Sequence, residues 1–170
     1  MSFREINYCS DKLIAFWKTL QPAFCAKYPG WGIYVNCSFR PPEEQFQLFC
    51  KGRRVVSHVD DKGKRVIDEA AVIHPGEIVT KVDGVTRIGS HSTNPSTAFD
   101  IAVSNPDGHN NYNYDLPQWN FKEFLVPGIV WGGAWGKRDA AGKILPGEFV
   151  DPPHFESDEY KTLFNNGKVA

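Results

Sequence analysis

Two histidines and two aspartates have the side chains that bind a divalent metal and use it. His91 lies nine residues before Asp100, and His154 ends the run Asp151-Pro152-Pro153-His154. Two imidazoles and one carboxylate leave one position of a tetrahedral ion open for water, as a catalytic zinc site requires. We therefore predict a zinc site formed by His91, Asp100 and His154.

Asp151 is the candidate general base of this site. The two prolines that follow it exclude a helix and favour extended or polyproline II backbone. In polyproline II, Asp151 and His154 project on the same side, with their Cα atoms about 9 Å apart. A carboxylate in that position could accept a proton from a metal-bound water without being a ligand itself.

Each of these residues also has an ordinary structural interpretation. His91 could be a solvated loop side chain, Asp100 could cap a turn, and an aspartate before proline is a common turn residue. Arg40 follows a predicted strand, where its guanidinium could bind a substrate carboxylate or a developing oxyanion. The alternative for Arg40 is a local ion pair with Glu43 or Glu44.

The four cysteines lie in the first third of the chain, and no two of them form a C-x-x-C pair. We expect them to be reduced and buried, behaving as small hydrophobic residues. A nucleophilic cysteine is the alternative, with Cys37 or Cys50 as the candidate.

The elements that must position these residues are short and of mixed type. Residues 98–103 alternate, so that Phe99, Ile101 and Val103 face a core while Asp100 lies between two alanines on the other face. Helices are predicted from Ser10 to the turn at 28–30, from Pro41 to Gly52, and at 118–124 and 158–164. Strands are predicted at 33–39, at 129–131, and in a hairpin of residues 55–59 and 65–67. This mixture indicates an α+β fold with a small antiparallel sheet and flanking helices.

Length and composition restrict the class of protein. The 170 residues fit one domain, 1–170, with 41% hydrophobic and 23% charged residues. A net charge of −1 argues against nucleic acid as a partner. We expect no membrane-spanning segment and no cleavable signal peptide. The polar loop Asn105–Asp115 could edge a cleft or hold calcium, although such loops are usually only solvated.

Five segments, in order, resemble the zinc peptidases of the D-alanyl-D-alanine carboxypeptidase/L-alanyl-D-glutamate peptidase superfamily, with single-domain bacteriophage endolysins as the nearest likeness. The likeness spans about residues 30–156. The segments are S-F-R-P-P-E-E-Q at 38–45 followed by K-G-R at 51–53, P-G-E-I-V-T at 75–80, S-H…A-F-D at 90–100, W-G-G-A-W at 131–135, and D-P-P-H-F-E at 151–156. The spacing from His91 to Asp100 is nine where the family has seven, and a loop absorbs two residues cheaply. Ser90 and Ser96 depart from the family's serine and glycine positions, so neither receives a role.

The resemblance implies a hedgehog/DD-peptidase-like zinc-peptidase architecture. It also implies Zn²⁺ on His91, Asp100 and His154, Asp151 as catalytic base, and Arg40 as a substrate or transition-state clamp. The expected partner is the stem peptide of bacterial peptidoglycan, cut by a monomeric catalytic domain that has no separate wall-binding domain.

The leading hypothesis is an L-alanyl-D-glutamate endopeptidase acting as a phage endolysin. It would be made in the host cytoplasm and reach the cell wall after a membrane breach. A D-alanyl-D-alanine carboxypeptidase or dipeptidase, a non-catalytic zinc-stabilised wall-binding or signalling domain, and a cysteine hydrolase are the alternatives.

Overall fold

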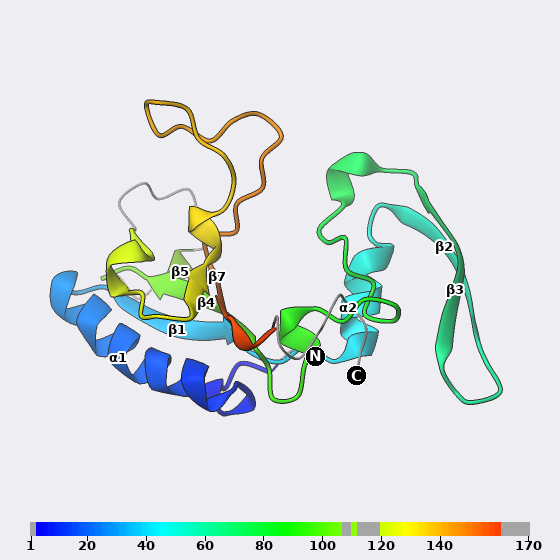
Figure 1. The fold of residues 1–170 in the computed structure, drawn as a ribbon, viewed down its shortest axis with the longest axis horizontal. Helices are drawn as coiled ribbons and strands as arrows, with labels where there is room; N and C mark the ends of the chain where they lie inside the picture. The colour runs from blue at the N-terminus through cyan, green and yellow to red at the C-terminus, as the bar shows by residue number, and fades with distance from the viewer. Residues whose placement is uncertain (1–2, 107–109, 112–119, 161–170) are drawn as a thin grey trace.

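The computed structural model describes residues 3–106, 110–111 and 120–160 (Figure 1). The predicted helix at 158–164 and the Asn105–Asp115 loop fall largely outside these residues, as does the start of the helix predicted at 118–124. In that last segment the described residues form a 3-10 helix, η4 (Phe121–Phe124).

One antiparallel sheet carries the centre of the fold. Its strands are β1 (Gly32–Cys37), β4 (Ala98–Ser104), β5 (Asn110–Asn111), β6 (Ile129–Trp131) and β7 (His154–Ser157). They are ordered β1-β4-β7-β6, and β5 pairs with the end of β4. Strands that are far apart in sequence therefore become neighbours, which brings residues 100 and 154 together.

The helix α1 (Asp11–Lys27) covers one face of this sheet (Figure 1). Leu13, Phe16, Leu20 and Phe24 recur at helical spacing and are at most 2% exposed. They pack in one hydrophobic core with Phe99 and other side chains of the sheet. The predicted helix is confirmed: it continues through Pro22 and ends at Lys27, before the turn that begins at Tyr28. Burial of the apolar stripe on both sides of Pro22 outweighs the single backbone hydrogen bond that proline removes.

A second group of elements lies to one side of the sheet (Figure 1). The helix α2 (Pro42–Cys50) starts with proline and two glutamates in its first turn, as the sequence predicts. The strands β2 (Arg53–Val59) and β3 (Arg65–Val72) form the predicted hairpin, and both extend beyond the predicted residues.

Four further 3-10 helices complete the described elements: η1 (Ile6–Tyr8), η2 (Pro75–Glu77), η3 (Ser90–Ser92) and η5 (Gly132–Ala134). The predicted α+β class with a small antiparallel sheet and flanking helices is thus confirmed, and α1 and α2 are the α-helices among the described elements. Within the described ranges, no helix has both the length and the apolar character that a membrane span needs.

Candidate metal centre

Cross-strand pairing places three of the candidate residues in one row across the sheet. Asp100 on β4 pairs with His154 on β7 on one side and with Cys37 on β1 on the other. The preceding pair, Phe99 and Phe155, lies on the core face, where the two rings stack with centroids 5.3 Å apart. Successive strand residues face opposite sides, so Asp100 and His154 lie on the face away from the core.

The 3-10 helix η3 carries His91 to this row. His91 Nε2 lies 3.1 Å from Asp100 Oδ1 and 3.1 Å from His154 Nδ1, and His154 Nδ1 lies 3.0 Å from Asp100 Oδ1. Three potential ligand atoms thus form a nearly equilateral triangle. A tetrahedral ion with ligands at 2.0–2.1 Å holds them about 3.3 Å apart, so the triangle fits a divalent ion. The structure therefore brings together the three residues that the sequence nominates as ligands.

His91 is oriented by groups on the other side of its ring. Its Nδ1 lies 3.1 Å from the backbone oxygen of Ser38 and 3.7 Å from Cys37 Sγ. Donation from Nδ1–H to the Ser38 carbonyl leaves the Nε2 lone pair free to bind a metal. The backbone N–H of Arg40 donates to the His91 carbonyl at 2.9 Å, which fixes η3 against the segment after β1.

His154 is oriented in the opposite sense, because its Nδ1 faces the triangle. Its Nε2 lies 3.4 Å from Glu156 Oε2, and Trp135 packs beside the ring at a centroid distance of 5.2 Å. A carboxylate behind a histidine ligand fixes the tautomer and raises the basicity of the ligand. Both imidazoles are almost fully buried, at 7% and 6% exposed.

The charges of the cluster support one another. Burial opposes ionisation of Asp100, yet His91 and His154 hold the pKa of its carboxyl well below the usual range. Burial likewise opposes protonation of His91, but the Asp100 carboxylate raises the pKa of this histidine to about 10. The pKa of His154 is also raised, against the effect of burial, by hydrogen bonds to Asp100 and Glu156. The cluster therefore combines a firmly ionised carboxylate with two imidazoles that bind protons strongly, and protons and metal ions compete for such nitrogens.

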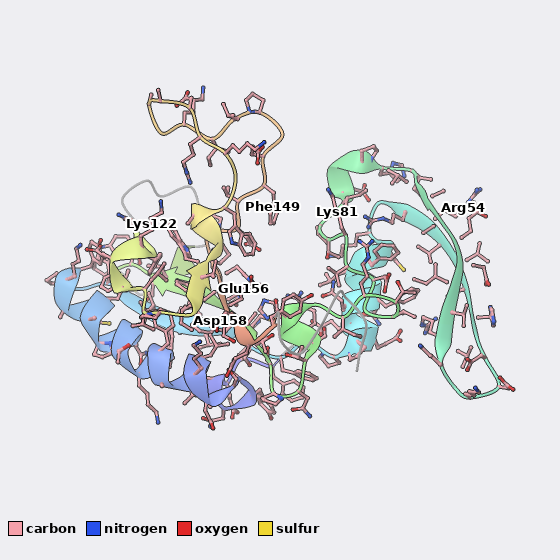
Figure 2. The ribbon with its side chains drawn as sticks, viewed as in Figure 1. Arg54, Lys81, Lys122, Phe149, Glu156 and Asp158 are labelled. Carbon is pink, nitrogen blue, oxygen red and sulfur yellow. The ribbon has the colours of Figure 1, made fainter. Side chains whose placement is uncertain are left out.

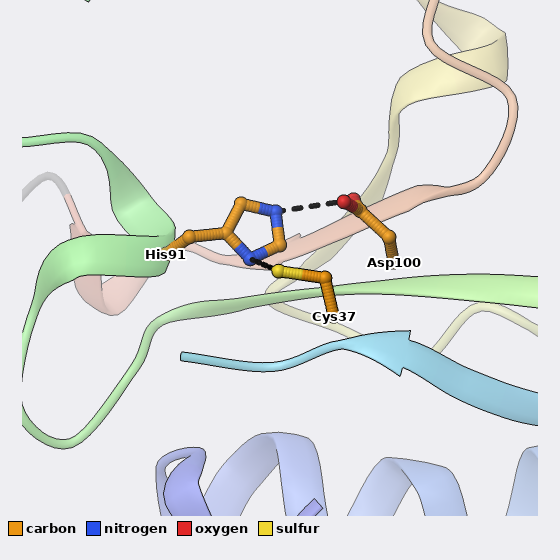
Figure 3. Close-up of side chains that lie close together, drawn as sticks. All are labelled: Cys37, His91 and Asp100. Carbon is orange, nitrogen blue, oxygen red and sulfur yellow. Dashed lines mark hydrogen bonds and ion pairs between the residues drawn. The ribbon is translucent and has the colours of Figure 1, made fainter. Parts of the chain in front are cut away.

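Cys37 lies directly beside the cluster (Figure 3). Cys37, His91 and Asp100 form a largely buried group that could hold a metal ion. Cys37 faces Nδ1 of the imidazole, whereas Asp100 faces Nε2, as Figure 3 shows. Burial opposes ionisation of the thiol, but His91 and Arg40 together lower its pKa.

The other cysteines depart from the prediction in different ways. All four are free thiols, and Cys9 and Cys37 are buried as predicted. Cys50 is only partly buried and Cys25 is exposed, so the expectation of burial is wrong for these two.

The cluster opens into a cavity of about 700 Å³. Its lining includes the triangle residues together with Arg40, Asp151, Glu156, Trp135, Phe149 and Lys81. This volume is typical of a small-molecule or peptide site. Trp135 lines this cavity, while Trp131 is a core residue at 7% exposed.

Asp151 reaches the cavity by a different backbone path from the one predicted. The N–H of His154 donates to the Asp151 carbonyl at 3.0 Å, so residues 151–154 form a turn and not polyproline II. A turn of this kind brings the first and fourth Cα atoms within about 7 Å, closer than the extended form. Burial raises the pKa of Asp151, which makes its carboxylate a stronger base.

The position of this turn depends on Gly132. The Asp151 N–H donates to the Gly132 carbonyl at 3.1 Å. A Cβ at residue 132 would lie 2.4 Å from the Asp151 carbonyl oxygen and 3.1 Å from the Cβ of His154. Only glycine permits this approach.

Arg40 borders the cluster. The alternative interpretation, a local ion pair with Glu43 or Glu44, is not seen for Glu43, which pairs with Arg65. Its Nη1 donates to Gln45 Oε1 at 3.0 Å, and its Nη2 lies 3.8 Å from Asp100 Oδ2. Among the described residues its buried Nε has no hydrogen-bond partner, so one donor of the guanidinium is uncommitted.

Several residues of the site were not assigned a role from sequence. The Ser38 carbonyl, Gln45 and Glu156 orient the candidate ligands and Arg40, and Ser96 reinforces the site by donating to the Ser38 carbonyl at 2.8 Å. Backbone groups carry no sequence signal. Gln45 and Glu156 lie in the segments that resemble the zinc peptidases, and this resemblance was the one sequence signal that could have indicated a role for them in the site.

No protein-family model matches this chain, and no curated protein has a matching sequence.

Proposed function

We propose that this protein is a zinc-dependent peptidase that hydrolyses an amide bond in the stem peptide of bacterial peptidoglycan. The preferred bond is that between L-alanine and D-glutamate, and the fold is a variant of the zinc-peptidase architecture. One observation carries the proposal: Nε2 of His91, Nδ1 of His154 and Oδ1 of Asp100 lie 3.0–3.1 Å apart at the wall of a large cavity. The five segments that resemble phage endolysins support the choice of substrate.

Zinc suits the donor set. Two imidazole nitrogens and one carboxylate oxygen are three of its common protein ligands, and a three-ligand site leaves a position for water or substrate. The Ser38 carbonyl behind His91 and the Glu156 carboxylate behind His154 supply the outer partners that such ligands need. When bound, zinc polarises a carbonyl and lowers the pKa of water to about 7.

Asp151 acts as the general base. It lines the same cavity as the ligands, and its raised pKa suits a group that takes a proton from the attacking water. The protonated Asp151 then donates to the amide nitrogen as that nitrogen leaves. Such general acid–base assistance is typically worth about 10²–10⁴-fold in rate.

Arg40 binds the oxygen that becomes negative when the amide carbonyl is attacked. Gln45 holds Nη1 of its guanidinium, and Arg40 lines the cavity beside Asp100. A fixed donor aimed at developing charge stabilises the transition state more than the ground state.

A cysteine hydrolase is the second candidate, favoured by the order Cys37–His91–Asp100. A thiol 3.7 Å from an imidazole that contacts a carboxylate is the arrangement of a nucleophile, base and orienting acid. Cys37 is only 4% exposed, however, and does not line the cavity, so a substrate bound there cannot reach its sulfur. We therefore favour the metallopeptidase.

The test compares wild type with Asp151→Asn and His154→Ala. From purified stem peptides we expect release of free L-alanine and of a peptide that begins with D-glutamate. We also expect about one zinc per wild-type chain and loss of activity with a chelator. Asp151→Asn should keep its zinc and lose about 10²–10⁴-fold in kcat, whereas His154→Ala should lose both.

Mass spectrometry of the products separates the related activities. Loss of the terminal D-alanine alone indicates a carboxypeptidase, and zinc binding with no product indicates a non-catalytic domain. Either result contradicts the proposed endopeptidase.

A further inference from the structure

Lys81 is a cation of the cavity wall that the proposed mechanism does not use. It lines the cavity and is exposed, and within the described part of the chain no carboxylate lies at ion-pair distance from its ammonium group. In Figure 2, Lys81 lies at the inner edge of the part that contains α2, on the side that faces Phe149 and Glu156. The cavity wall therefore carries a positive charge that forms no ion pair within the described part of the chain.

The backbone that carries Lys81 is fixed on both sides. Gln45 Nε2 donates to Thr80 Oγ1 at 3.1 Å and to the Val82 carbonyl at 2.7 Å. Arg53 Nη2 also donates to the Thr80 carbonyl at 3.0 Å. A charged side chain on a fixed segment loses less freedom on binding a ligand than one on a loose loop.

Gln45 also connects this segment to Arg40. It is only 3% exposed, and its two ends bind the Arg40 guanidinium and the 80–82 segment. The two cations therefore lie on one supporting unit, with Arg40 beside Asp100 and Lys81 farther along the wall.

The proposed substrates share a carboxylate at a fixed position. In L-alanyl-D-glutamate, D-glutamate supplies the nitrogen of the scissile bond. Its α-carbon, which is bonded to that nitrogen, carries a free carboxylate. The terminal D-alanine of a D-alanyl-D-alanine peptide does so as well. A cavity of about 700 Å³ corresponds to a sphere about 11 Å across, which the four-methylene chain of lysine can partly span.

We propose that Lys81 determines specificity by binding the free carboxylate of the residue on the leaving side of the scissile bond. This inference rests on the proposed peptidase function. It makes the protein selective for stem peptides that carry a carboxylate there over those in which it is amidated. Carboxylates elsewhere on the stem peptide gain nothing from Lys81.

The test uses two synthetic stem peptides that differ only in the D-glutamate α-carboxylate or its carboxamide. Wild type should favour the carboxylate peptide about tenfold in kcat/KM, the size of one charge-assisted hydrogen bond. Lys81→Ala should abolish this preference through KM and leave hydrolysis of the carboxamide peptide unchanged. Lys81→Arg should restore most of the preference. Lys64→Ala, in the turn between β2 and β3 and outside the cavity lining, should behave as wild type.

Binding of both peptides to Asp151→Asn and to Asp151→Asn/Lys81→Ala separates this inference from the proposed function. In one outcome, wild type cleaves neither peptide, Asp151→Asn binds the carboxylate peptide more tightly than the carboxamide peptide, and the double variant shows no such difference. Lys81 then keeps its role in binding the carboxylate, and the peptidase proposal fails. If wild type cleaves both peptides equally, or Lys81→Ala keeps the preference, the role of Lys81 is wrong while the peptidase proposal stands.

Discussion

Gly132→Ala tests the geometry of the site without changing any group that performs chemistry. The added Cβ would lie 2.4 Å from the Asp151 carbonyl oxygen, about 1 Å closer than ordinary contact. It would also lie 3.1 Å from the Cβ atoms of both Asp151 and His154. Since the closest atom belongs to the backbone, the whole 151–154 turn must move, and the proposed base and one ligand move with it.

The expected magnitudes follow from that displacement. Overpacking of a well-packed region costs about 1–3 kcal/mol. For a chain of this size, about 2 kcal/mol lowers the melting temperature by about 4–8 °C. A displacement near 1 Å of reacting groups can cost about 10²-fold in rate, so the loss of kcat/KM should exceed what unfolding explains.

The assay is thermal unfolding with and without zinc, together with a zinc titration and kcat/KM on a stem peptide. Gly76→Ala is the matched control, because a Cβ at Gly76 meets no atom within 4 Å. We expect this control to melt, bind zinc and react as wild type. If Gly132→Ala melts within about 1 °C of wild type and binds zinc equally well, the close approach of Gly132 to the turn is refuted.

Three further predictions concern the cluster and the Cys37 thiol beside it. Because the pKa of His91 is raised to about 10, the imidazole is protonated at pH 7 in the metal-free protein. Zinc binding should therefore release about one proton or more. For each proton released, the apparent affinity for zinc should fall about tenfold when the pH is lowered by one unit. Equal zinc affinity at pH 6 and pH 8 would contradict this prediction. The folding stability of the metal-free protein should depend on pH in the opposite direction. The protonated His91 paired with Asp100 stabilises the fold fully below the ordinary histidine pKa of 6.5, and this stabilisation is lost as the pH rises toward 10. Cys37→Ser should cost less than about tenfold in peptidase activity, the lower end for changes beside a ligand, because the Ser38 carbonyl still holds His91. Thiol alkylation of wild type should leave the activity intact. Loss of activity in both cases would favour the cysteine hydrolase.

The sequence predicts the parts of the site that depend on local periodicity. Alternation along β4 correctly places Phe99 in the core and Asp100 on the opposite face, because a strand has a period of two. The start of α2 is predicted for a similar reason, since proline and two glutamates favour the first turn of a helix.

The parts that depend on irregular backbone are not predictable in this way. Cys37 continues the buried alternation of Ile33 and Val35, so a regular strand would place it opposite Phe99 on the core face. The register shifts between Val35 and Cys37, and Cys37 instead pairs with Asp100. The 151–154 turn is a second case, because its conformation follows from the hydrogen bond between Asp151 and Gly132, a tertiary contact.

The candidate metal centre and the hydrophobic core share the same two strands, and this explains why the candidate ligand atoms can be held so closely. Phe99 and Phe155 stack on one face, while the neighbouring pair, Asp100 and His154, meets on the other. The core pair fixes the spacing and register of β4 and β7, and that register brings Oδ1 and Nδ1 to 3.0 Å. Only His91 must be added from outside the sheet, and the Ser38 carbonyl and the backbone bond from Arg40 hold it in place. Folding of the core therefore already fixes two of the three candidate ligands. A metal ion that binds there loses less of its binding free energy to the conformational entropy of these side chains, so its affinity should be higher.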